Sequence, residues 1–160
     1  MRFRQILAKT FEETRKIVKL YSRRCDIEQL FRVTKKKGFA LQSTKLKTFE
    51  AILKITIMVL KSASVILQLI RARDNKNAQP IEEVFSKEEI AVLEKLNIDL
   101  KGKTKLLKNN NPPDRLSWVA WVVARLGGWK GYSSRGLPGP ITFKRGLENF
   151  LVYVDASRIL

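Results

Sequence analysis

The sequence predicts a mainly α-helical protein, and three observations on its 160 residues support this prediction. Apolar residues recur at helical spacing through several long segments. Two of these segments begin with the Ser/Thr-x-x-Glu pattern of a capping box, at Thr10–Glu13 and at Ser86–Glu89. Polar stretches or glycine- and proline-rich stretches separate the segments. Residues 3–8 (FRQILA) are compatible with a short strand ahead of the first helix.

The first half of the chain is expected to form two long helices. The first runs from Phe11 to Lys36 and stops at Gly38, because glycine tolerates the backbone conformation that ends a helix. The second runs from about Thr44 to Arg73 and is apolar on most faces, which predicts a buried helix. Three charged residues interrupt its apolar run and argue against a membrane span: Glu50, Lys54 and Lys61. We therefore expect no membrane partner.

The polar segment DNKNAQP, at residues 74–80, is the expected domain boundary. It divides the chain into residues 1–75 and residues 76–160. In the second part, the capping box that begins at Ser86 opens a helix that reaches about Leu96. A basic, turn-rich stretch follows and is expected to be an exposed loop.

A nearly all-apolar helix is expected between the start signal Asn111-Pro112 and the stop signal Gly127. Its Trp118 and Trp121 require burial, either in a core of this domain or against a partner. A glycine- and proline-rich loop separates it from a last helix that begins at about Ile141.

The charge of the chain predicts a polyanionic partner. Its 32 Lys and Arg against 15 Asp and Glu give a formal net charge of +17, an imbalance that folding does not need. The positive charges are spread along the chain rather than placed beside an apolar anchor, so nucleic acid is favoured over a membrane surface. One cysteine and no histidine exclude an internal disulfide, His-based catalysis and His-ligated metals. The first residues lack the apolar core of a signal peptide, and we expect a cytoplasmic protein.

The first long helix carries the pattern Y-x2-R-x3-E-x6-K, formed by Tyr21, Arg24, Glu28 and Lys35. At about 100° per residue these four side chains fall within an arc of roughly 80°, which Arg32 joins. Cations hold phosphate oxygens and a carboxylate holds a divalent metal, so this combination is typical of phosphoryl-transfer sites. The alternative is a solvated helix face on which the charges form salt bridges.

The pattern resembles the Y-R-E-K element of DDE transposases of the insertion-sequence-four (transposon-five-like) family. The similarity continues through IEQLFRVTKKKGF, at residues 27–39. A second stretch, LSWVAWVVARLGGWKGYSSRGLPGPITFKRGL at residues 116–147, is similar to the C-terminal region of the same transposases. It contains LGGW, PGP and RGL in the family's order, and the two similarities together cover roughly residues 10–150.

The resemblance implies the C-terminal fragment of an RNase H-like catalytic core, followed by an all-helical dimerisation domain. In this family two aspartates and one glutamate hold two divalent metals, Mg²⁺ or Mn²⁺, for cutting and joining DNA. Glu28 matches the catalytic, metal-holding glutamate. The positions that hold DNA are matched by Tyr21, Arg24, Arg32 and Lys35.

The two aspartates of the family have no counterparts in this chain. The acids before Glu28 are Glu12, Glu13 and Asp26; the first two suit the start of a helix, and Asp26 points away from Glu28. The chain is therefore expected to be inactive alone and to bind Mg²⁺ or Mn²⁺ poorly. Cys25 stands where the family commonly has tryptophan, which removes an aromatic surface for stacking on a base.

The resemblance further implies binding to transposon-end DNA and self-association, as a homo-oligomer or as a hetero-oligomer with a full-length transposase. The last helix supplies the predicted dimerisation stripe, which consists of Phe143, Leu147, Phe150, Leu151 and Val154. Gly146 in the same helix is expected to permit a close approach of a helix from the second molecule. One alternative function is a standalone basic nucleic-acid-binding protein, or an inhibitor of transposition, derived from a transposase. The other is an intact small nuclease, against which the missing aspartates argue.

Overall fold

A computed structural model of the chain describes residues 10–35, 39–40, 43–75, 78–102, 104, 107–132, 134 and 136–159, except for the side chains of residues 22, 23, 25 and 26. Over these residues the protein is mainly helical and contains no strand, which confirms the predicted mainly α class. The helices are α1 (Phe11–Thr34), α2 (Phe49–Ala72), the 3₁₀ helix η2 (Ile81–Glu83), α3 (Lys87–Leu100), α4 (Leu116–Leu126) and α5 (Pro140–Ile159). The strand considered for residues 3–8 lies outside the described residues.

Local signals account for three of the helix ends. The Thr10 hydroxyl accepts a hydrogen bond from the backbone N–H of Glu13 at the start of α1, over 3.2 Å. Both halves of the second capping box form, because Ser86 and Glu89 each bind the other's backbone N–H. Gly127 is the C-cap of α4, as predicted. The predicted stop of α1 at Gly38 lies outside the described residues, and α1 ends at Thr34.

Helix α2 begins later than predicted, at Phe49 rather than at Thr44. The Thr44 hydroxyl accepts a hydrogen bond from the backbone N–H of Leu46 over 3.2 Å. A threonine side chain bonded two residues ahead stabilises a turn that competes with the helix. This local bond favours a turn over a helix at residues 44–46.

The hydrophobic core gathers around α4, in which Leu116 to Ala124 are all buried. Trp118 and Trp121 therefore pack in the core of the chain itself rather than against a partner. The same core takes buried residues from the other helices, among them Val33, Ile66, Leu69, Leu93, Phe143 and Phe150. Because α2 and α4 contribute to one core, packing joins the two parts of the chain on either side of residues 74–80. The division into domains at residues 75 and 76 stays a prediction.

Helices α4 and α5 approach each other closely at two glycines. A Cβ atom at Gly146 would lie 1.9 Å from the backbone carbonyl oxygen of Val123. A Cβ atom at Gly127 would lie 2.0 Å from the backbone carbonyl oxygen of Thr142. We expected Gly146 to permit a close helix approach in a contact between molecules, and the structure places such an approach inside the chain.

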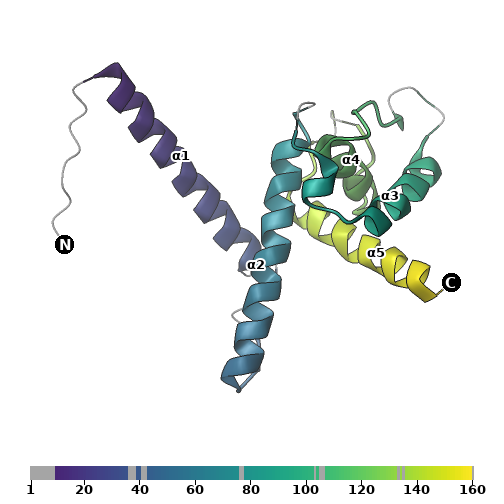
Figure 1. Ribbon diagram of the computed structural model, residues 1–160, viewed down its shortest axis with the longest axis horizontal. Coiled ribbons are helices and arrows are strands. Elements are labelled where there is room, and N and C mark those ends of the chain that lie inside the picture. Colours follow the sequence, from purple (N-terminus) through teal and green to yellow (C-terminus); the bar gives the residue numbers. More distant parts are fainter. Residues whose placement is uncertain are drawn as a thin grey trace.

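Helix α1 and the first half of α2 project from the body formed by α3, α4, α5 and the second half of α2 (Figure 1). The prediction that α2 is buried is correct for its second half, which carries Ala63, Ile66 and Leu69. It is wrong for the first half, where the side chain of Phe49 is 77% exposed and that of Met58 is 68% exposed. The reason is that no described segment covers this end of the helix.

Helix α2 is also, among the described helices, the one long and apolar enough to cross a membrane by length and composition. This is weak support for a membrane span, because a core helix of a soluble protein meets the same criteria. Its second half is packed in the core described above.

Candidate nucleic-acid interface

Three of the predicted site residues contact one another on α1. The Arg24 guanidinium donates a hydrogen bond through Nε to Oε1 of Glu28, over 3.1 Å. Arg24 also lies over the Tyr21 ring, with its Cζ atom 5.9 Å from the ring centroid. The side chains of Arg24 and Glu28 are 67% and 63% exposed, so solvent screens their ion pair. This geometry leaves the outer edge of the guanidinium and the tyrosine ring open to a ligand.

The remaining two predicted residues lie at the end of the same helix. Arg32 is in the last turn of α1 and reaches the edge of a cleft between α1, α2 and α5. Lys35 follows the helix as its C-cap, with an extended backbone conformation and with Nζ 5.8 Å from the centroid of the Phe31 ring. The predicted helical arc therefore holds from Tyr21 to Arg32, whereas the position of Lys35 does not follow from helical periodicity.

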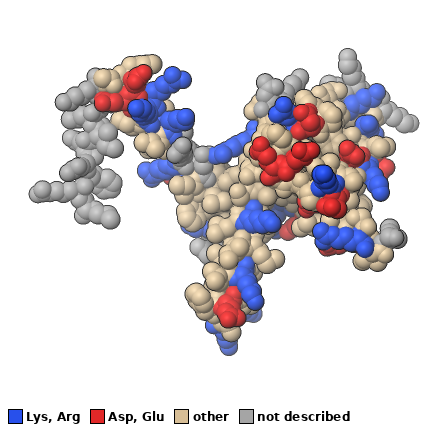
Figure 2. Space-filling model, viewed as in Figure 1, with Lys and Arg blue, Asp and Glu red and all other residues tan. Residues whose placement is uncertain are grey.

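Charge is unevenly distributed over the molecule. In Figure 2 Lys and Arg side chains lie along α1 and the projecting end of α2, with a few acidic side chains at the first turns of both helices. The largest group of acidic side chains lies over the body, where Lys and Arg side chains also occur. The segment from η2 through α3 supplies six of the acids: Glu82, Glu83, Glu88, Glu89, Glu94 and Asp99. The cluster of acids on η2 and α3 therefore makes that surface less favourable to a polyanion than the more basic remainder of the chain.

Whether the site around Glu28 fits a divalent metal depends on the carboxylates that lie near it. The described residues contain no group of three or more Cys, Asp or Glu side chains placed to hold an ion. Glu28 is a single carboxylate that already pairs with Arg24. Mg²⁺ takes several oxygen ligands in a near-octahedral arrangement, which one exposed carboxylate beside a guanidinium does not supply. The set of residues does not fit the metal that the resemblance implies.

The predicted dimerisation stripe divides into two groups. Phe143, Phe150 and Val154 are buried in the core of the chain, and Leu147 packs partly against it. Leu151 is 51% exposed. Its neighbours Val152 and Tyr153, which the stripe did not include, are 67% and 50% exposed. An association through α5 would therefore use Leu151 and these neighbours, and it stays a prediction.

The structure also brings Arg32 together with basic residues that the sequence does not link to it. Arg71 near the end of α2, Arg73 just after it and Lys144 in the second turn of α5 line the same cleft. No local sequence pattern pairs residues so distant along the chain. Only the packing of three helices shows that these cations are neighbours.

Comparison of the sequence with protein-family models gave no matching family, and comparison with curated proteins gave no match.

Proposed function

We propose that this chain is the C-terminal part of a DDE transposase of the insertion-sequence-four family, which binds transposon-end DNA and self-associates. The observation that carries the proposal is the exposed set of Tyr21, Arg24 and Glu28 on α1, in the order and spacing of the Y-R-E-K element. The net charge of +17 supports a nucleic acid as the partner. The single cysteine fits a reducing compartment, and the proposed location is the cytoplasm.

The exposed apolar surface of α1 and α2 supports the same proposal. In α1, burial is confined among the described side chains to Val33 and Thr34. Large apolar side chains are exposed along both helices: Phe11, Val18, Leu20, Ile27, Phe31, Phe49, Ile52, Leu53, Ile57, Met58 and Leu60. Large exposed apolar patches on soluble proteins usually mark a surface that another protein segment covers. Under the proposal, the catalytic core that carries the two aspartates covers it.

The purified chain is expected neither to nick nor to join DNA in Mg²⁺ or Mn²⁺. The reason is that one carboxylate is present where the two-metal reaction requires three. Incubation of supercoiled plasmid with the chain and each metal, followed by gel analysis, measures this. Metal-dependent cleavage that disappears in Glu28→Ala would contradict the prediction and support the small-nuclease alternative.

Arg24→Ala and Lys35→Ala are each expected to weaken DNA binding and to lower the salt slope of the affinity by about one unit. Glu28→Gln is expected to tighten binding slightly, because it removes the negative charge that pairs with Arg24. The measurement is fluorescence anisotropy of a labelled duplex in metal-free buffer across a salt series.

The matched control is Lys95→Ala, which removes the same charge from the exposed surface of α3. It is expected to leave both the affinity and the slope close to those of the unmodified chain. If the variants of Arg24 and Lys35 behave like this control, the face of α1 is a solvated surface and the proposed interface is wrong.

A standalone basic nucleic-acid-binding protein is the second candidate function. The observation that favours it is that the cations of α1 are exposed within this chain and need no other protein to reach a phosphate. Binding to the terminal sequences of the transposable element distinguishes the candidates. Preference for those sequences over unrelated DNA of equal length supports the transposase proposal, and equal affinity supports the standalone protein.

A further inference from the structure

A cleft of about 540 Å³ lies where the end of α1, the end of α2 and the start of α5 meet. Its volume falls within the range of about 300 to 1,000 Å³ that is common for ligand-binding clefts. Four of the residues that line it are basic and none is acidic. The full lining is Gln29, Arg32, Val33, Leu67, Ile70, Arg71, Arg73, Pro140, Ile141 and Lys144.

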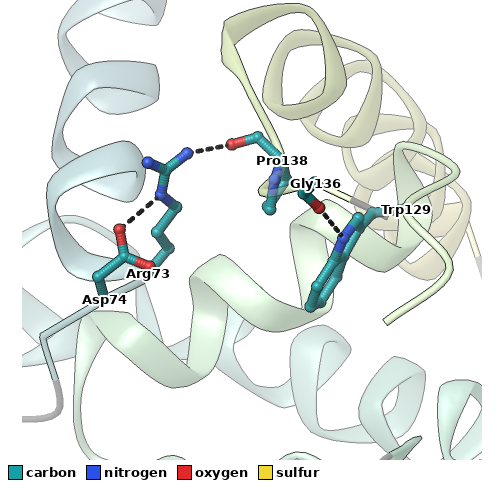
Figure 3. Close-up of polar contacts among 5 residues, drawn as sticks. All are labelled: Arg73, Asp74, Trp129, Gly136 and Pro138. Atoms are coloured by element: carbon teal, nitrogen blue, oxygen red, sulfur yellow. Dashed lines mark hydrogen bonds and ion pairs between the residues drawn. The ribbon is translucent and has the colours of Figure 1, made fainter. Parts of the chain in front are cut away.

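The start of α5 is held at the cleft by a clamp on the preceding loop. Nη1 of Arg73 donates a hydrogen bond to the backbone carbonyl oxygen of Pro138 over 2.6 Å, and Nε of the same guanidinium pairs with Asp74 over 2.8 Å (Figure 3). The Trp129 indole N–H donates to the carbonyl oxygen of Gly136 over 3.1 Å. The Arg73 bond ties the loop to the end of α2, and the Trp129 bond ties it to the segment that follows α4. Arg73 therefore serves mainly to position α5.

The other three cations that line the cleft are exposed or partly exposed: Arg32, Arg71 and Lys144. Nζ of Lys144 pairs with Glu148 over 3.0 Å and lies 5.4 Å from the centroid of the Phe39 ring. Arg32 belongs both to the cleft and to the basic face of α1. Because α5 begins at Pro140, the positive end of its helix dipole also lies at this cleft. The surroundings therefore favour an anion over a neutral ligand.

We propose that this cleft binds the phosphate backbone of DNA that also contacts the Tyr21–Arg24 face, so that α1, α2 and α5 hold one continuous stretch of DNA. The inference rests on the proposed DNA binding and adds a second contact region that the sequence did not reveal. Arg32 connects the two regions, since it is the residue they share. The residues expected to contact phosphates are Arg32, Arg71 and Lys144.

The test compares a cleft variant with an α1 variant of equal charge. Arg71→Gln/Lys144→Gln keeps part of each aliphatic stem, and Arg24→Gln/Lys35→Gln removes two charges from α1. The control is Arg145→Gln, which removes a charge from an exposed position on α5 that does not line the cleft. Circular dichroism is used to check that each variant retains the helix content and melting temperature of the unmodified chain.

In anisotropy measurements the cleft variant is expected to bind a duplex at least about tenfold more weakly and to lower the salt slope by about two units. Combining it with the α1 variant is expected to multiply the two losses. If the cleft variant binds like Arg145→Gln while the α1 variant is weakened, the cleft proposal is overturned and the proposed DNA binding stands. If the cleft variant and the α1 variant each bind like Arg145→Gln, the cleft proposal and the proposed DNA binding are both overturned.

Free inorganic phosphate presents the same oxygen atoms as the DNA backbone. A second measurement therefore distinguishes these two ligands. Inorganic phosphate is titrated at constant ionic strength while the melting temperature is recorded. Stabilisation that requires Arg71 and Lys144, together with unchanged DNA affinity in the cleft variant, would overturn the DNA proposal and assign the cleft to a free anion. Loss of DNA affinity in the cleft variant, with no stabilisation of the unmodified chain by phosphate, supports the DNA proposal.

Discussion

Gly146→Ala is expected to lower the free energy of unfolding by about 2 kcal/mol or more. The added Cβ would lie 1.9 Å from the backbone carbonyl oxygen of Val123, far inside van der Waals contact. A backbone atom in α4 cannot rotate away as a flexible side chain can, so α5 must move off α4. Alanine also raises helix propensity by about 1 kcal/mol relative to glycine, which offsets only part of this cost. Thermal unfolding followed by circular dichroism is expected to show a decrease in melting temperature of roughly 4 to 8 °C.

Gly139→Ala is the matched control for this prediction. A Cβ at Gly139 meets no atom within 4 Å, and its φ angle is not in the left-handed region. Its melting temperature is therefore expected to stay close to that of the unmodified chain. Gly127→Ala, which would meet the carbonyl oxygen of Thr142, is expected to destabilise the chain as Gly146→Ala does. Unchanged melting temperatures in both Gly127→Ala and Gly146→Ala would show that α4 and α5 do not cross at these glycines.

The two glycines give a physical reason for parts of the motifs noted in the sequence. Gly127 belongs to LGG and Gly146 to RGL, and the structure places the two side by side between α4 and α5. From the sequence we expected Gly127 to end a helix and Gly146 to permit close packing against a second molecule. Which helix approaches Gly146 depends on tertiary packing, and no local pattern contains that information.

Most of the secondary structure could be predicted, because helix starts depend on nearby residues. The capping residues Thr10 and Ser86 each act on a backbone group three residues away. Burial was harder to predict than helix formation. The apolar composition of α2 predicted a buried helix, yet whether Phe49 is covered depends on what other segments lie beside it. Whether residues 1–75 belong to an RNase H-like core likewise depends on segments that would pack against α1 and α2. That assignment therefore remains a proposal.

The candidate site was predictable only where its contacts lie within one helix. Arg24 and Glu28 are four residues apart, and side chains at this spacing meet on a helix face. Lys35 follows the last helical residue, so its position depends on the cap rather than on periodicity. The cleft that joins Arg32 to Lys144 requires three helices to pack together. The helical spacing of apolar residues in α5 likewise predicted its apolar face. It did not show that Phe143 and Phe150 on this face pack inside the chain.

The second large effect is expected in cells that contain a full-length transposase of the same element. Under the proposed function, the chain keeps the region that pairs transposase molecules and lacks two catalytic carboxylates. A mixed pair then has at most one complete active site, whereas cut-and-paste transposition acts at both ends of the element. If pairing is random and the chain is in about tenfold excess, a full-length molecule meets another full-length molecule in only about one pairing in eleven. The number of pairs of two full-length molecules then falls roughly tenfold. Transposition is expected to fall by a comparable factor.

The exposed surface of α5 provides the variant that tests whether pairing causes this inhibition. Leu151 and Val152 are exposed, so replacing both with Asp spares the core that Phe150 and Val154 fill. Charged groups placed in an apolar contact are costly to bury without partners, so Leu151→Asp/Val152→Asp is expected to abolish association and restore transposition. Ile98→Asp is the control, because it places the same charge at a 66% exposed apolar position on α3. It is expected to inhibit as strongly as the unmodified chain.

Transposition is measured as the frequency of element movement in a strain that expresses the full-length enzyme with each form of the chain at equal protein level. Analytical ultracentrifugation of the purified forms measures association directly, with the unmodified chain and Ile98→Asp expected to associate and Leu151→Asp/Val152→Asp expected to be monomeric. Equal transposition with and without the unmodified chain would show that it does not form inactive pairs. Inhibition that persists in the monomeric α5 variant would instead indicate competition for the DNA ends, which the DNA-binding variant Arg24→Ala would then be expected to relieve.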